Sequence, residues 1–468
     1  MNINILETSD LDNISNDTQV GDCSNAAMSD YLNFRTGDFW RKLVPYENVT
    51  ASEFNDHRWQ VKNSISSQRR VIEFLKKVAS EDFIEEVEKA LNKVPMRVRI
   101  TPYMLSLIDW DSPVNDPIRL QFLPLSSEIC EDHPMLTLDS LNEQADSPIE
   151  HLVHRYPDKV LFLPQSSCPV YCRYCTRSYA VGGSTDTVEK KSGRLSAFDE
   201  EAIFAYLSEH TEIEDVVVSG GDLYNLTGTE MRHLGIRLLR LPNIKRIRLA
   251  TKGLAISPMR ILNHDDWTQA LIEISAEGRR LHKQVALHTH FNHCQEITDI
   301  TRQAMQVLYA NHVTVRNQAV MLRGVNDSYK AQSELIKLLS ALNIQPYYVY
   351  QHDMVQGLEF LRTPLWRMLE IEEKVRGITA GFNIPTFVVD LPNGGGKRDV
   401  WSFRYYDQET GLSVYRAPSV KENTYFFYAD PLHSLSYENA VKWDEKGAVE
   451  KFKKQALDSA QRNSFKSR

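Results

Sequence analysis

Three cysteines in one short segment are the residues of this chain best suited to chemistry. Cys168, Cys172 and Cys175 lie in the run SCPVYCRYCTR with the spacing C-x3-C-x2-C. Iron–sulfur clusters take cysteine thiolates as ligands, one to each iron. Three thiolates leave the fourth iron of a cubic cluster without a protein ligand, so a small molecule can bind there. The run therefore predicts a [4Fe–4S] cluster with one open coordination site.

Zinc, a disulfide and a coincidental spacing are the alternatives. A structural zinc site needs four ligands, usually two C-x2-C pairs or a mixture of cysteine and histidine. The chain has no second pair, because Cys23, Cys130 and Cys294 are scattered singly. A disulfide is disfavoured because three close cysteines leave one unpaired and nothing indicates secretion. Iron is therefore the favoured metal.

A second candidate site is the lysine that follows three glycines in the run LPNGGGK, residues 391–397. The run is not a phosphate-binding P-loop, because its first glycine is missing and Arg398 follows Lys397. A lysine amine on a glycine tether can form a Schiff base with an aldehyde cofactor. An exposed turn lysine is the simpler alternative.

Two aspartates each follow a predicted strand. Asp353 and Asp390 could form an acid–base pair, ligate a metal or bind a cation, and each could also be an ordinary cap or turn residue. The pattern alone leaves these roles open.

Composition limits the classes of protein. The 468 residues are 42% hydrophobic and carry a net charge of −8, so a large core is possible and no broad basic surface attracts nucleic acid. No apolar run is long enough to cross a membrane, and the N-terminus does not resemble a signal peptide. We expect a cytoplasmic protein.

Alternating strands and helices should position these side chains. Short apolar runs are separated by amphipathic stretches typical of helices, which predicts βαβ units around a parallel sheet. The runs are residues 160–164, 215–219, 247–251, 285–290, 313–322 and 346–351, and the stretches are 197–210, 230–241, 268–281, 297–311 and 329–342. Six units favour a partial or complete β/α barrel, with an open doubly wound sheet as the alternative. Polar residues follow every strand, as expected at the active face of a barrel.

Around this core we expect five parts. Residues 1–37 are a disordered lead-in, 38–147 a helical N-terminal region and 148–355 the partial barrel. Residues 356–445 form a C-terminal region with the lysine loop and a β-hairpin within 405–428, and 446–468 form a basic tail. Within these parts, helical spacing also marks residues 64–93 and 363–380.

Several sequence motifs, in the same order along the chain, resemble those of the lysine 2,3-aminomutase family of radical S-adenosylmethionine (SAM) enzymes, which also use pyridoxal phosphate. The matching motifs are HRYPD (154–158), CPVYCRYCTR (168–177), SGGD (219–222), THFNH (289–293), NQAVMLRGVND (317–327), PYYVYQ (346–351), GLEFLRT (357–363) and PTFVVD (385–390). The resemblance covers roughly residues 38–430 and implies a partial (β/α)6 barrel of the radical SAM type, with a helical N-terminal region and a C-terminal extension.

The resemblance implies a role for each matched residue. Cys168, Cys172 and Cys175 would hold the cluster, and Ser219, Gly220, Gly221, Asp222, His290 and Gln318 would contact SAM. Lys397 would carry pyridoxal phosphate, with Arg155 and Tyr156 beside the cofactor. Arg177 would bind the substrate α-carboxylate, and Asp353 and Asp390 its distal cation. Lys159 and His352 depart from the family pattern, and zinc-binding cysteines known in some members are missing, so no zinc is expected.

The implied activity is radical transfer of the α-amino group of a basic amino acid to C3, because both acids are present. L-lysine is the first expectation and L-arginine the next, since the acids do not distinguish well between these two cations. A less favoured alternative is a protein-lysine-modifying relative, and a third is a cluster-bearing sensor or nucleic-acid module. Expected partners are the amino acid substrate, an electron donor such as flavodoxin or ferredoxin, and further copies of the chain in a homo-oligomer. Neither nucleic acid nor a membrane is expected as a partner.

Overall fold

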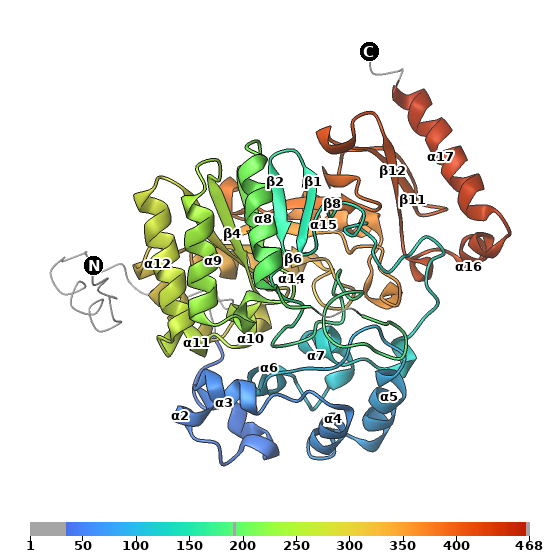
Figure 1. Cartoon of the computed structure of the whole chain (residues 1–468). Helices are drawn as coiled ribbons and strands as arrows, with labels where there is room; N and C mark the ends of the chain where they lie inside the picture. The colour runs from blue at the N-terminus through green and yellow to red at the C-terminus, as the bar shows by residue number, and fades with distance from the viewer. Residues whose placement is uncertain (1–33, 191–192, 465–468) are drawn as a thin grey trace, which may run out of the picture.

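The computed structural model describes residues 34–190 and 193–464 (Figure 1). Most of the expected lead-in, residues 1–33, therefore lies outside the described residues, as do residues 465–468 of the tail. Arg35 is already part of the fold, because its Nη1 donates to the carbonyl oxygens of Ser106 and Leu107, both at 3.1 Å.

A nine-stranded sheet with the strands in chain order, β1 to β9, forms the centre of the molecule. Its strands are β1 (Leu152–Tyr156), β2 (Lys159–Phe162), β3 (Asp215–Val218), β4 (Arg246–Ala250), β5 (Gln284–Thr289), β6 (Thr314–Val320), β7 (Ile344–Tyr350), β8 (Thr386–Leu391) and β9 (Gly396–Asp399). Strands β2 to β8 are parallel, and β1 and β9 pair antiparallel at the two edges. The expected β/α barrel type is confirmed, and the parallel sheet extends past the six expected strands to β8.

Five crossover helices connect the strands close to the predicted positions: α8 (Ala197–Glu209), α9 (Gly228–Arg240), α12 (Asp266–Arg280), α13 (Asp299–Ala310) and α14 (Tyr329–Ala341). Most begin after a capping side chain that accepts a backbone N–H, as Ser196, Thr227 and Ser328 do. In Figure 1, α8, α9 and α12 lie side by side on the outside of the sheet. This arrangement leaves the loops after the strands free to build a site.

Strand β8 belongs to a further βα unit. The preceding helix α15 (Leu365–Val375) is shorter than the stretch 363–380 expected from the sequence. Five of the six β8 residues are buried, and the strand pairs with β7. Because β8 continues directly into the β8–β9 turn, Asp390 and Lys397 are held by the sheet itself.

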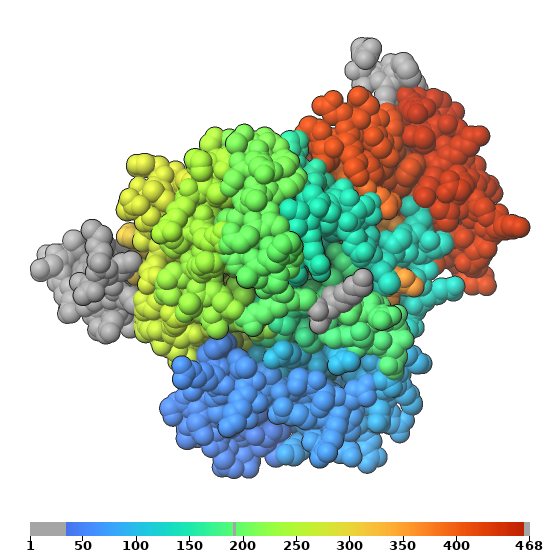
Figure 2. Space-filling model, viewed as in Figure 1, coloured from blue at the N-terminus to red at the C-terminus, as the bar shows by residue number. Residues whose placement is uncertain are grey.

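Short helices of the N-terminal region form a base under one end of the sheet (Figures 1 and 2). They are α2 (Ala51–Phe54), α3 (His57–Lys62), α4 (Gln68–Leu75), α5 (Glu81–Leu91), α6 (Pro102–Leu107) and α7 (Pro117–Phe122). The expected helical stretch 64–93 is divided into α4 and α5, because Ser80 caps the start of α5.

The C-terminal part adds a second, three-stranded antiparallel sheet instead of the expected hairpin. Its strands are β10 (Phe403–Asp407), β11 (Leu412–Arg416) and β12 (Tyr425–Ala429). Helix α17 (Ala448–Ser464) packs on this sheet through Phe452, Ala456 and Ala460, which recur every four residues. Among the described residues, no helix combines the length and apolar character needed to cross a membrane.

Candidate functional site

The N-terminal region holds the cysteine loop that follows β2. The backbone N–H of Tyr171 donates to Arg99 O at 3.0 Å, and Arg99 Nη1 donates to Cys168 O at 3.1 Å. The backbone N–H of Arg173 donates to Gln121 O at 2.9 Å. Two segments outside the sheet therefore fix the path of the loop.

The three thiols of this loop lie close enough to influence one another electrostatically. Burial raises the pKa of Cys168, and Asp222, Cys175 and Cys172 raise it further. Within the described ranges, no three His, Cys, Asp or Glu side chains are grouped to bind a single metal ion. A four-iron cluster does not need that grouping, because each thiolate binds a different iron. The donor set fits such a cluster.

The glycine pair after β3 packs against the cysteine loop. A Cβ on Gly221 would lie 2.2 Å from Ser167 O, and one on Gly220, whose φ is +102°, would lie 2.3 Å from Gln165 O. The backbone N–H of Gly221 donates to Gln165 O at 2.6 Å. The sequence suggested that these glycines admit a ligand, but the close neighbour here is protein backbone. Gly220 also lines a cavity, described below, so the expected SAM contact stays a prediction.

The carboxylate of Asp222 accepts hydrogen bonds from neighbouring loops of the protein. Its buried carboxylate accepts the backbone N–H groups of Tyr224 and Lys252, both at 2.8 Å, and the hydroxyl of Thr251. These bonds join the loops after β3 and β4. Asp222 thus organises the loops, and its expected contact with SAM stays a prediction. No side-chain hydrogen bond is formed by Ser219 within the described part of the chain.

The two other expected SAM residues lie further along the sheet, His290 directly after β5 and Gln318 in β6. His290 Nε2 is 2.9 Å from Tyr174 Oη, a residue of the cysteine loop, and burial lowers the pKa of His290 to about 3. Gln318 Nε2 is 3.0 Å from His288 Nδ1 inside the barrel. His290 is therefore neutral and within reach of the cysteine loop.

Lys397 is a strand residue and not the end of a flexible tether. Gly394 and Gly395 lie in the turn of the β8–β9 hairpin and Gly396 begins β9, and the register places Lys397 opposite Asp390. Lys397 Nζ donates to Asp390 Oδ2 at 2.7 Å, and Lys397 N donates to Tyr156 Oη at 2.9 Å. The ammonium also lies 5.6 Å from the ring centre of Tyr350. Burial opposes the charge of Lys397, but Asp390, Tyr350 and Tyr156 together raise the pKa of Lys397.

Asp353 lies near Asp390 and is tied to the cysteine loop. Its Oδ2 accepts the hydroxyl of Thr176 at 2.5 Å. Burial and then the charge of Asp390 raise the pKa of Asp353 to about 7, whereas Thr176 and Lys397 lower it. Asp390 Oδ1 is buried and has no hydrogen-bond partner among the described residues. The two carboxyl groups therefore have unused capacity to accept hydrogen bonds from a cation.

Both arginines expected to bind ligands are already held by acids from one irregular segment, residues 139–147, here called the clasp. Arg177 Nε and Nη2 donate to the two oxygens of Glu143, each at 2.8 Å. Arg155 Nε donates to Asp146 Oδ2 at 2.6 Å, and its Nη2 donates to Leu141 O at 2.5 Å. The clasp therefore holds both arginines, and it also contacts the turn before Lys397, because the backbone N–H of Asn393 donates to Ser140 O at 2.8 Å.

Glu143, Asp146 and Thr176 were not predicted as site residues. Glu143 is 34 residues from Arg177, Asp146 is nine from Arg155, and the clasp has no helix or strand that would mark a buried face. Only Thr176 had a local signal, because it stands between Cys175 and Arg177.

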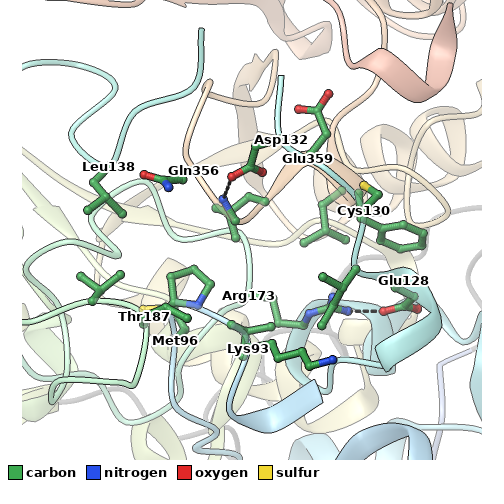
Figure 3. Close-up of a pocket in the computed structure, with 18 residues that line it drawn as sticks. Lys93, Met96, Glu128, Cys130, Asp132, Leu138, Arg173, Thr187, Gln356 and Glu359 are labelled. Carbon is green, nitrogen blue, oxygen red and sulfur yellow. Dashed lines mark hydrogen bonds and ion pairs between the residues drawn. The ribbon is translucent and has the colours of Figure 1, made fainter. Parts of the chain in front are cut away.

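Two cavities border the cysteine loop on different sides. One of about 480 Å³ is lined by Arg177, Tyr179 and Gly220, together with Gln144 and Ser147 of the clasp. The other, of about 240 Å³, contains Arg173 and Glu128 and none of the predicted cofactor residues (Figure 3). Arg173 Nη1 donates to Glu128 Oε2 at 2.7 Å there, which anchors the loop from behind. Of these two cavities, only the first is lined by predicted site residues, namely Arg177 and Gly220.

The chain is similar to known proteins over most of its length. The family model "Lysine-2,3-aminomutase" matches residues 371–406. L-lysine 2,3-aminomutase of Clostridium subterminale is 38% identical over 361 residues, 77% of this chain and 81% of that protein. The Bacillus subtilis enzyme of the same name is 38% identical and covers 76% of this chain and 71% of its own.

Two further comparisons are more distant. Glutamate 2,3-aminomutase of Clostridioides difficile is 32% identical over 76% of this chain and 79% of its own. A radical SAM methyltransferase of Sphaerobacter thermophilus has a TM-score of 0.33 at 18% identity over 51% of this chain and 68% of its own, too weak a similarity to carry an argument. The extent of the aminomutase matches shows that the chain belongs to the lysine 2,3-aminomutase family and is an isomerase of the aminomutase class.

Proposed function

We propose that the protein is a 2,3-aminomutase for a basic amino acid and that L-lysine is its substrate. The observation that carries this proposal is the acidic pair beside Lys397. Asp353 and Asp390 interact, and Asp390 Oδ1 is buried without a partner among the described residues. A buried acceptor of this kind is costly unless a ligand satisfies it, and an ammonium group would do so.

The proposed cofactors are a [4Fe–4S] cluster on Cys168, Cys172 and Cys175, SAM, and pyridoxal phosphate on Lys397. When bound, they would supply a hydrogen-abstracting radical and an electron sink for migration of the amino group. The residues of the chain bind and orient. Lys397 would hold pyridoxal phosphate covalently, with Arg155 at its phosphate and Tyr156 beside it, while the open iron and the predicted loop residues would hold SAM.

The substrate would lie between a positively charged group and a negatively charged pair at opposite ends of the site. Arg177 would bind the α-carboxylate, as suits a planar guanidinium, and Asp353 with Asp390 would hold the distal ammonium. Attachment of Lys397 to pyridoxal phosphate would remove an ammonium from Asp390 Oδ2, which now accepts from it at 2.7 Å. Asp390 would then be available to the cation of the substrate.

The test is an anaerobic assay of protein reconstituted with iron, sulfide, pyridoxal phosphate and SAM. L-lysine, L-arginine, L-ornithine and L-glutamate are offered separately, and the products are identified by mass spectrometry. A β-amino acid formed fastest from L-lysine supports the proposal. Faster conversion of L-arginine would overturn the substrate assignment, and inactivity with all four despite bound cluster and pyridoxal phosphate would overturn the aminomutase proposal.

A further inference from the structure

Arg177 has two hydrogen-bonding edges, and Glu143 occupies one of them. A guanidinium can bind a carboxylate through Nε and Nη2, its side edge, or through Nη1 and Nη2, its end edge. Glu143 takes the side edge with two bonds of 2.8 Å. Nη1 of Arg177 has no hydrogen-bond partner among the residues that the structure describes. The end edge is thus available to a second carboxylate.

Glu143 is itself firmly held. Its side chain is 5% exposed, and Tyr179 Oη donates to its Oε2 at 3.0 Å. Within the clasp, Asp139 accepts the backbone N–H groups of Glu143 and Gln144 at 2.9 and 3.0 Å, and Ser147 Oγ donates to Glu143 O at 2.8 Å. A carboxylate with so many fixed contacts cannot easily turn away from Arg177.

We propose that Glu143 is a positioning residue that holds Arg177 by its side edge, so that the end edge is presented to the α-carboxylate of the substrate. This inference rests on the proposed function, because it takes Arg177 as the carboxylate-binding residue. The pKa of Glu143 agrees with an ion pair between Glu143 and Arg177 that persists when substrate binds. Burial opposes the charge of Glu143, but Arg177, Arg155 and Tyr179 together keep the pKa of Glu143 below its ordinary value.

The contrary reading makes Glu143 a placeholder that the substrate carboxylate must displace. The two readings predict opposite effects of Glu143→Gln, which keeps the size of the side chain and removes its charge. The amide can accept only one of the two N–H groups, so the guanidinium loses its fixed orientation. A positioning role predicts weaker substrate binding, whereas a placeholder role predicts tighter binding because the competing carboxylate is lost.

The experiment measures binding of L-lysine and L-lysinamide by calorimetry to anaerobic holoenzyme without reductant, so that no turnover occurs. We expect Glu143→Gln to weaken L-lysine binding by about 10- to 100-fold, the usual effect of losing a charge-assisted contact. Binding of L-lysinamide, which has no carboxylate, should change by less than about threefold. Tighter L-lysine binding, or equal losses for both ligands, would overturn the proposal.

Asp146→Asn is the matched control, because it makes the same acid-to-amide change in the same clasp but acts on Arg155. It should weaken retention of pyridoxal phosphate and leave the preference for L-lysine over L-lysinamide within about threefold of the wild-type value. If it removes that preference as strongly as Glu143→Gln does, the effect belongs to the clasp as a whole and the proposal fails.

Failure of the proposed function would look different. If the unaltered protein does not bind L-lysine, the same comparison is made with whichever amino acid binds and with its amide, because every α-amino acid carries the carboxylate. Loss of the preference in Glu143→Gln would then support the positioning role although the substrate assignment had failed. Retention of the preference would overturn it for any substrate.

Discussion

Asp353 should reduce stability in the absence of ligand, and Asp353→Asn tests this directly. Burial and the neighbouring Asp390 raise the pKa of Asp353 from 3.8 to about 7. A carboxyl group whose pKa is raised on folding is neutral in both states at low pH and ionised in both at high pH. Its unfavourable contribution is therefore absent below pH 3.8, grows as the pH rises and is complete above about pH 7.

The magnitude follows from the two pKa values. Linkage gives a penalty of about 2 kcal/mol at pH 5 and about 4 kcal/mol at pH 8, both upper bounds because solvent near the site reduces them. Asparagine is uncharged throughout and can still accept the Thr176 hydroxyl. We therefore expect Asp353→Asn to stabilise the ligand-free protein by about 1–3 kcal/mol more at pH 8 than at pH 5.

Thermal unfolding of the cofactor-free protein at both pH values, at one scan rate, measures the effect. Each kcal/mol corresponds to roughly 1–2 °C for a protein of this size. Thr176→Val is the companion variant, since loss of its hydroxyl should raise the pKa of Asp353 further and destabilise the protein at pH 8. An equal shift at both pH values, or destabilisation by Asp353→Asn at pH 8, would refute the reasoning.

Three further results are expected. Lys397→Ala should abolish covalent attachment of pyridoxal phosphate and with it the visible absorbance band of the attached cofactor. The control Lys159→Ala should keep this band. A band that persists without Lys397 would reject the assignment. Gly221→Ala places a Cβ 2.2 Å from the Ser167 carbonyl and should at least halve the iron bound per chain, while Gly381→Ala, with nothing within 4 Å, should leave iron unchanged; equal iron in the two variants would contradict the packing argument. Binding of L-lysine to holoenzyme should tighten as the pH rises from 6 to 8, because the cation needs ionised Asp353, whose pKa is about 7 in the free protein; a flat calorimetric profile in this range would oppose the cation-binding role.

Local patterns were sufficient to predict the barrel units. Helix α14 begins at Tyr329 as expected because Ser328 caps it, and β3 contains a run of valines, buried or half-buried, and pairs with β2 and β4. The meeting of Asp390 with Lys397 also has a local origin. Both belong to one hairpin, and its register places them opposite each other.

Other features depend on contacts between distant, irregular segments, which a single sequence does not reveal. Glu143 and Arg177 are 34 residues apart, and neither lies in a helix or strand that would show which way its side chain points. The region of helix α17 was expected to be a basic tail because residues 446–468 are rich in lysine and polar residues. Its buried face is narrow and becomes meaningful only when the β10–β12 sheet is present to cover it.

Three groups of the proposed site belong to consecutive residues, Cys175, Thr176 and Arg177. One would hold the cluster, the next donates to Asp353 at 2.5 Å, and the third would hold the substrate carboxylate. Because successive Cα atoms are about 3.8 Å apart, the backbone would then fix the spacing between the proposed cluster ligand and the proposed carboxylate-binding residue. A relative that accepts a longer or shorter amino acid can therefore keep this tripeptide unchanged. Its sequence must change where the distal end of the substrate would bind, on β8 and in the loop after β7.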